Sequence, residues 1–204
     1  MTKRRTDSTA MTEQELRDYA ADHISYELSM LYETAMCLEH GKALDTEIIV
    51  TNALVESFAI HARTLAQFLY YGPRRPGDVT AEEYVRNVRA WKEARGSIPP
   101  ELQEVIDRTG KEIAHLTIRR PPSGDPQKRW NVAHVFRLFF RPLHVFLAHT
   151  EPARLDVGVA AFINELENPE GSSKAIKTWV AMTPGESSYH TSSPGSGLPP
   201  ERSY

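Results

Sequence analysis

The segment from Asp45 to Tyr71 constrains the fold most, because it has unbroken helical periodicity and contains neither glycine nor proline. Mostly apolar side chains recur in it at three- and four-residue steps, so they stack on one side of a helix and require burial against neighbours. These residues are Thr51, Val55, Phe58, Ala62, Leu65 and Leu69. The segment therefore predicts a long helix packed deep in a bundle.

Polar side chains form a second stripe beside the apolar one. They are Asn52, Glu56, Arg63 and Gln67, with His61 at the edge. Charged groups are rarely buried unless they are paired. In one interpretation Glu56 holds Arg63, two turns away, in a buried structural network. In the other, Glu56, His61 and Arg63 face a later helix and form a shared site with His115.

The helix before this central one is predicted from signals at its two ends. Thr12 and Glu15 have the spacing of a capping box, in which the hydroxyl and the carboxylate satisfy free backbone N–H groups. Gly41 suits the end of this helix, and Asp45 can cap the start of the next. Because the loop between them is short, the two helices should lie antiparallel.

Three further helices are predicted after the loop that follows Tyr71. A capping-box pattern at Thr80 opens the first, which ends at Gly96. Pro100 suits the first turn of the second, and Pro126 the first turn of the third and most apolar one. Pro142 lies inside that last helix, where it removes a backbone donor, so we expect a kink or break there.

These signals predict an all-α fold, an antiparallel bundle of four or five main helices with disordered termini. We expect a disordered arm over residues 1–11 and the helical bundle domain over residues 12–150. Weaker apolar patterns predict short docking helices over residues 151–182, and a Ser-, Gly- and Pro-rich composition predicts a disordered tail over residues 183–204.

Composition narrows the class of protein. The formal net charge of -3 gives no overall basicity, so a case for nucleic-acid binding depends on local patches. The single cysteine, Cys37, excludes an intramolecular disulfide and a cysteine-based zinc site. The start MTKRR is not followed by an apolar core, and no run approaches a membrane span, so we expect a cytoplasmic protein without membrane contact.

One charged helical face combines the groups that metal-free RNA cleavage requires. Arg108, Glu112, His115 and Arg119 follow one another at helical steps. A cation near a phosphodiester can stabilise developing negative charge while a histidine moves protons. The structural alternative is a solvated face in which Glu112 pairs with Arg108 or Arg119.

A second basic line lies on the aromatic-rich helix, where His134, Arg137, Arg141 and His144 share one side. Further arginines could extend this line into an anion-binding patch that serves RNA, a nucleotide or an acidic partner. They are Arg63, Arg74, Arg75, Arg119 and Arg120. An ordinary solvated face is the alternative.

A metal site has weak support. Glu112 and His115 have the Glu-x-x-His spacing of di-iron bundles, but such sites need that motif on two helices and the chain holds one copy. Separately hydrogen-bonded histidines are the plainer interpretation. We also find no phosphate-cradling Gly-rich loop and no nucleophile motif, so neither a metal nor a cofactor is predicted.

Two segments carry a family resemblance. NALVESFAIHARTLAQFLY and GKEIAHLTIRR resemble a family of uncharacterised bacterial all-helical proteins, which pair an Asn-x-x-x-Glu-x-x-x-x-His-x-Arg helix with a Lys-x-Ile-Ala-His-Leu-Thr segment, over roughly residues 12–150. More distantly, a compact bundle with a basic residue and a histidine on one late helix is similar to the HEPN superfamily, many of whose members are metal-free RNases of toxin and antiphage systems.

The HEPN resemblance implies specific roles. The usual pattern is Arg, a polar residue, three others and then His, and counting back from His115 puts Gly110 in the arginine position and Lys111 in the polar one. His115 with Arg108 or Lys111 would inherit the catalytic role. A symmetric homodimer is implied as well, because HEPN sites form between two subunits.

The functional hypothesis is an RNA-directed, HEPN-like protein. As a metal-independent ribonuclease it would use His115 as acid/base, Arg108, Lys111 and Arg63 to stabilise phosphate charge, and Glu56 in the same site. RNA or another anionic ligand is the predicted partner. The alternative is a non-catalytic helical interaction module in which the same polar residues are internal struts.

Overall fold

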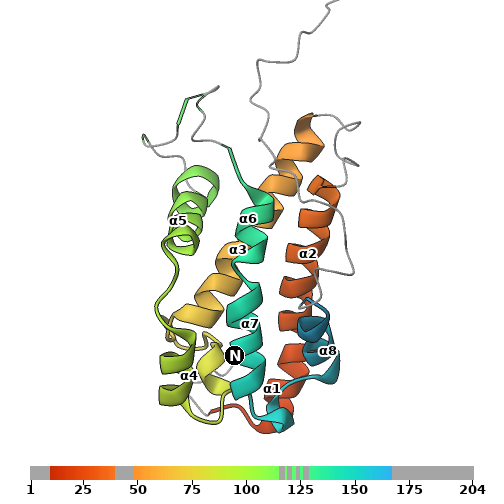
Figure 1. Ribbon diagram of the computed structural model, residues 1–204, viewed down its shortest axis with the longest axis vertical. Helices are drawn as coiled ribbons and strands as arrows, with labels where there is room; N and C mark the ends of the chain where they lie inside the picture. The colour runs from red at the N-terminus through yellow and green to blue at the C-terminus, as the bar shows by residue number, and fades with distance from the viewer. Residues whose placement is uncertain are drawn as a thin grey trace, which may run out of the picture.

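The computed structural model describes residues 10–39, 48–114 and 129–166, together with positions 118, 121, 122 and 125. Over these residues the fold is all-α, as predicted, and has no β-strand, only isolated bridge residues such as the antiparallel pair Val85 and Thr150. Successive long elements run in opposite directions along the molecule (Figure 1). The antiparallel bundle expected from the sequence is therefore confirmed for the described part of the chain.

The first column of the bundle is one continuous helix with a π-helical turn inside it. It comprises α1 (Glu13–Tyr19), the π segment η1 (Ala20–Ile24) and α2 (Ser25–Glu39). The predicted capping box forms: the Glu15 N–H donates to Thr12 Oγ1 across 3.2 Å, and the Thr12 N–H donates to Glu15 Oε2 across 2.8 Å. The wider π turn keeps the buried residues four apart through this stretch. They are Leu16, Ala20, Ile24 and Leu28.

The central helix is α3 (Ile48–Tyr70), which packs against α2, α5, α6 and α7. Val55, Phe58, Ala62, Leu65 and Leu69 are each 4% exposed or less, and Thr51 is 8% exposed, so the apolar stripe predicted for this helix is confirmed. The residues proposed to end one helix and cap the next, Gly41 and Asp45, lie outside the described part of the chain.

The helix predicted from Thr80 to Gly96 is wrong as a single element. A short 3-10 turn, η2 (Ala81–Glu83), ends at Tyr84, and α4 (Val88–Arg95) starts separately. Between them the backbone pairs with another segment: Arg86 N–H donates to His149 O, and Glu151 N–H donates to Tyr84 O. The Asn87 side chain then caps α4 by accepting from Ala90 N–H across 3.0 Å. Tertiary pairing thus overrides local helical periodicity here.

The later helices follow the prolines. α5 (Pro100–Arg108) begins at the predicted proline and continues into a second π segment, η3 (Thr109–Ala114). The apolar helix is divided into α6 (Val132–Arg137) and α7 (Phe140–His149), so the break expected near Pro142 is confirmed. Asn131 caps α6 by accepting from His134 N–H, whereas the start predicted at Pro126 lies outside the described residues.

The last helix of the described residues covers the side of the first column. After the 3-10 turn η5 (Pro152–Arg154), α8 (Val157–Glu165) begins at Asp156, whose carboxylate accepts from Gly158 N–H and Val159 N–H. Val159 and Ile163 are buried against the bundle, so the first docking helix expected after residue 150 is present. The second, predicted near Trp179, lies outside the described residues.

An aromatic cluster is centred on α7, which contacts both α3 and α4. Phe146 makes edge contacts with Phe68, Tyr84 and Trp91 at ring-centroid distances of 5.5 to 6.0 Å. Such edge-to-face contacts add to the burial of large apolar surfaces. Among the described helices, none combines the length and hydrophobicity that crossing a lipid bilayer requires.

Candidate functional site

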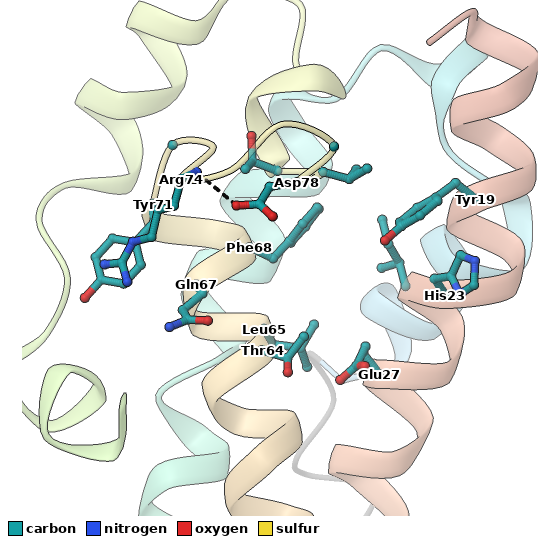
Figure 2. Close-up of a pocket in the computed structure, with 15 residues that line it drawn as sticks. Tyr19, His23, Glu27, Thr64, Leu65, Gln67, Phe68, Tyr71, Arg74 and Asp78 are labelled. Carbon is teal, nitrogen blue, oxygen red and sulfur yellow. Dashed lines mark hydrogen bonds between the residues drawn. The ribbon is translucent and has the colours of Figure 1, made fainter. Parts of the chain in front are cut away.

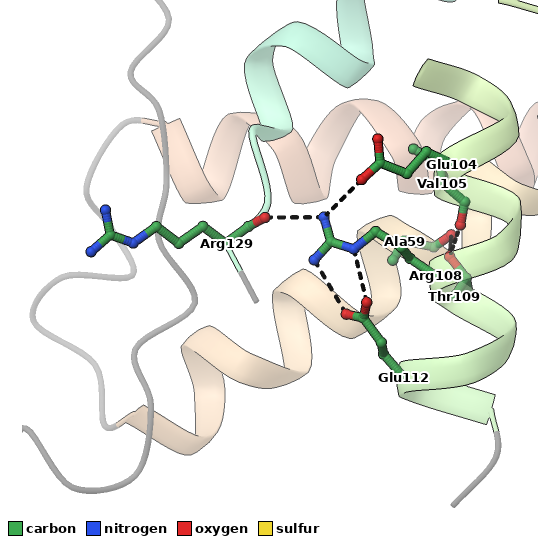
Figure 3. Close-up of polar contacts among 7 residues, drawn as sticks. All are labelled: Ala59, Glu104, Val105, Arg108, Thr109, Glu112 and Arg129. Carbon is green, nitrogen blue, oxygen red and sulfur yellow. Dashed lines mark hydrogen bonds and ion pairs between the residues drawn. The ribbon is translucent and has the colours of Figure 1, made fainter. Parts of the chain in front are cut away.

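Arg108, one of the predicted phosphate-binding residues, is held in an ion pair (Figure 3). Its Nε lies 2.9 Å from Glu112 Oε1 and its Nη2 lies 3.2 Å from Oε2. Nη1 donates to the Arg129 carbonyl across 3.1 Å, and the guanidinium sits 4.3 Å from the centre of the Trp130 ring. The charge of Arg108 is therefore neutralised, as the ion-paired alternative for this face predicted.

The neighbouring turn of η3 contacts the central helix. Thr109 Oγ1 lies 2.7 Å from the Val105 carbonyl and 3.2 Å from the Ala59 carbonyl, which ties η3 to α3. Arg63 lies beside Gly110, since a β-carbon there would be 3.9 Å from Arg63 Nη1. The structure thus brings Arg63 to the element that carries Lys111, which is exposed. His115 lies outside the described residues, so its place relative to Arg63 and Lys111 stays a prediction.

The buried network predicted around Glu56 is wrong. Glu56 is exposed and Arg63 is partly buried, so the Glu56 carboxylate does not lie in the core and does not form a buried pair with the Arg63 guanidinium. The reason is helical phase: Glu56 shares the outer side of α3 with Ile49 and Ile60, which are 70% and 46% exposed. A charge on that side is solvated and needs no buried partner.

The carboxylate that does meet the central helix is Glu27 of α2. Its Oε2 lies 2.8 Å from His61 Nδ1, and His61 is only 8% exposed. Tyr26 covers the same imidazole with an edge-on ring contact at 5.5 Å. Sequence reasoning missed Glu27, because its pairing with His61 depends on the register of α2 against α3. Its position beside the buried Leu28 was the available signal.

A cavity of about 380 Å³ is lined by Glu27 and lies between the first column and the second half of α3 (Figure 2). The π segment η1 and the loop over residues 71–80 complete its walls. Tyr19 and Phe68 supply aromatic surface, while Glu27 and Asp78 supply carboxylates. π-Helical turns are frequent at functional sites because they displace side chains from the regular register.

The second basic line faces outward only at its two arginines, on α6 and α7. Arg137 and Arg141 are exposed, as is Arg129 just before α6, and the histidines of this stretch are partly buried. From Arg129 to His149 the chain carries no Asp or Glu. Among the additional arginines of the predicted patch, Arg74 and Arg75 lie on the loop after α3, while Arg119 and Arg120 lie outside the described residues.

Arg95 of α4 joins this basic surface. It lies over the rings of Tyr70 and Trp91, at 4.6 and 5.6 Å from their centroids. Burial raises the pKa of Tyr70, and the charges of Arg95 and Arg141 oppose that rise. Burial also lowers the pKa of Arg95, and its Nε is buried without a hydrogen-bond partner among the described residues.

The described residues hold no group of three or more His, Cys, Asp or Glu side chains that could bind a metal ion. His61 contacts Glu27, and His144 Nδ1 lies 2.7 Å from the Phe140 carbonyl, so these two histidines are engaged separately. The chain matches no protein-family model, no curated protein and no solved structure. The fold and its sites define this protein as an all-α bundle with a basic face and a separate cavity.

Proposed function

We propose that this protein binds single-stranded RNA on the basic face formed by Arg129, Arg137 and Arg141 of the α6–α7 stretch and by Arg95 of α4. The observation that carries the proposal is the Nε of Arg95, which is buried beside the Tyr70 ring and has no hydrogen-bond partner among the described residues. Buried donors without partners are rare and costly, and a phosphate oxygen would satisfy this one.

The charge distribution favours an anionic polymer. The chain has a formal net charge of -3, yet the stretch from Arg129 to His149 has only basic ionisable side chains. Arginines on such a surface bind phosphate oxygens with two donors each and release condensed counterions. Because the aromatic rings here are mostly buried, we expect little stacking on bases and little sequence preference.

The catalytic extension of the proposal is metal-independent cleavage at the η3 end of the bundle. His115 would act as acid/base, with Lys111 and Arg63 near the scissile phosphate. Arg108 would position these groups instead of contacting phosphate, since Glu112 already takes its charge. The HEPN resemblance adds a symmetric homodimer in which two such ends meet.

Binding is tested by fluorescence anisotropy with a labelled, mixed-sequence single-stranded RNA over a salt series. Each phosphate contact contributes about 0.7 to the slope of log K against log salt. Arg141→Gln should therefore weaken binding and flatten the slope by about that amount. Arg89→Gln is the matched control, because Arg89 is an exposed arginine of α4 paired with Glu93. Equal effects of the two substitutions would reject the assigned face.

Cleavage is tested by incubating the protein with the same RNA in EDTA, comparing wild type with His115→Ala. Products that persist in EDTA but vanish in the variant support the catalytic extension. If wild-type protein binds but does not cut, the binding proposal stands and the catalytic extension falls. Unchanged circular dichroism spectra must accompany the comparison.

A non-catalytic interaction module is the second candidate, favoured by one observation. The outer side of α3 exposes Ile49 and Ile60, and Tyr26 of α2, 55% exposed, contacts His61 beside Ile60. Exposed apolar groups gathered on one face are typical of interfaces. A second copy of the chain is the proposed partner. Sedimentation should then show a dimer that Ile60→Lys converts to monomer, and an unchanged mass would exclude this interface.

A further inference from the structure

The cavity beside Glu27 carries a second proposal, independent of RNA binding. It lies between the first column and α3, and its volume of about 380 Å³ falls within the usual range for small-molecule sites. We infer that it binds a small organic cation, whose ammonium group contacts the Glu27 carboxylate and whose apolar body lies against Phe68 and Tyr19.

The cavity wall carries the carboxylates of Glu27 and Asp78 as well as the basic residues His23 and Arg74, and we assign the ammonium group to Glu27. Glu27 contacts His61 through Oε2 alone, and its Oε1 takes part in no hydrogen bond among the described residues. Figure 2 shows this carboxylate directed into the space near Thr64. A carboxylate fixed by one partner and open on its other oxygen is a ready acceptor for an ammonium donor.

In the loop that closes the cavity, the backbone N–H donors already bind a carboxylate of the chain itself. Asp78 Oδ2 accepts from the Arg74 N–H across 2.9 Å and from the Arg75 N–H across 2.8 Å. These are the backbone donors that a bound phosphate or carboxylate would need. The Arg74 guanidinium turns to the ring of Tyr71, 4.0 Å from its centroid, and Figure 2 shows the pair across α3 from Tyr19 and Glu27. The Asp78 carboxylate therefore already takes the position that an anionic ligand would need.

The aromatic side chains favour an organic cation over a bare metal ion. Phe68 is anchored by edge contacts with Tyr84 and Phe146 and lines the cavity together with Tyr19. Aromatic faces attract ammonium groups, most strongly where water is displaced. Thr80, 5% exposed, also lines the cavity, and its Oγ1 is buried without a hydrogen-bond partner among the described residues. A bound molecule with a second polar group would satisfy it.

The test uses three probes of similar shape and different charge: phenethylammonium, phenethyl alcohol and phenylacetate. Each is titrated into the full-length, isotope-labelled chain near neutral pH, and chemical-shift changes are followed by NMR. Phenethylammonium should bind at least about tenfold more tightly than the other two, a difference typical of one charge-assisted contact. Equal or stronger binding of phenylacetate, or no binding of phenethylammonium, overturns the proposal.

Variants then locate the site. Glu27→Gln should weaken phenethylammonium binding about tenfold, whereas Glu33→Gln, an exposed position on the same helix, should not. Thr64→Lys places a competing ammonium on the exposed rim and should abolish binding, and Thr64→Glu should preserve it. Because Thr64 is exposed, this pair separates loss of the site from loss of the fold. Retained binding in Thr64→Lys overturns the assignment, and RNA binding should be unaffected in all four variants.

Discussion

Arg108 and Glu112 form a two-pronged ion pair across one helical turn: Arg108 Nε lies 2.9 Å from Glu112 Oε1, and Arg108 Nη2 lies 3.2 Å from Glu112 Oε2. The Arg108 side chain is 18% exposed and the Glu112 side chain is 16% exposed. The same arginine reaches the Arg129 carbonyl, so the pair links the end of α5 to the segment that enters α6. Arg108, predicted from the sequence to stabilise phosphate charge, therefore connects α5 to the segment that enters α6.

We predict a larger coupling energy for this pair than for an exposed pair of equal spacing. A double-mutant cycle with Arg108→Gln and Glu112→Gln should give about 1 to 2 kcal/mol, because the two groups are mostly shielded from water. The control is Arg89 with Glu93, whose side chains are 89% and 67% exposed. Its cycle should give about 0.3 to 0.5 kcal/mol. Urea unfolding measures both, and equal values would contradict the structural role.

Glu56→Ala should change the free energy of unfolding by no more than about 0.5 kcal/mol, the usual range for surface substitutions. A buried network would have required a loss of about 3 to 5 kcal/mol on removing one partner. The physical reason is that Glu56 is exposed on the outer side of α3. The midpoint of urea unfolding decides between the two values.

Stability should fall as the pH rises above about 10, the ordinary pKa of tyrosine. Burial raises the pKa of Tyr19, Tyr70 and Tyr84 in the folded protein. The unfolded state therefore loses these protons first, so the stabilisation is complete below the unfolded pKa and is lost as pH rises toward the folded one. Urea midpoints measured from about pH 8 to pH 11 check this decline.

Tyr84→Phe should make that alkaline decline shallower. Tyr84 is fully buried and donates to the Leu16 carbonyl across 3.0 Å, so the variant should also lose about 1 kcal/mol at pH 8. Tyr26→Phe, at a position 55% exposed, is the control and should change neither quantity. An unaltered alkaline slope in Tyr84→Phe would show that another group governs the transition.

Thr109→Val should cost about 1 to 3 kcal/mol, because the Thr109 hydroxyl is buried against the Ala59 and Val105 carbonyls and valine leaves the tie to α3 unmade. Thr109→Ser keeps the hydroxyl and should retain the tie while losing one methyl group. Thermal unfolding of the three proteins ranks them. Equal melting temperatures for the serine and valine variants would remove the hydrogen bond as the cause.

Several features of this protein follow from sequence alone because their causes are local. The capping box at Thr12 and Glu15 depends on two side chains three residues apart, and the break before Pro142 depends on a missing backbone donor. The buried stripe of α3 follows from periodicity, since a helix with one apolar side must cover it. All-α class and antiparallel order were predictable on these grounds.

Tertiary structure decided which polar groups meet. Local periodicity continued through Tyr84, but the pairing of residues 84–86 with residues 149–151 ended the helix there. Periodicity also predicted that Glu56 pairs with Arg63. Instead, the register of α2 against α3 places Glu27 against His61, and the cavity lies next to Glu27. Spacing along one helix determines which side chains share a face, but only packing between helices determines which face is buried and which partner it meets.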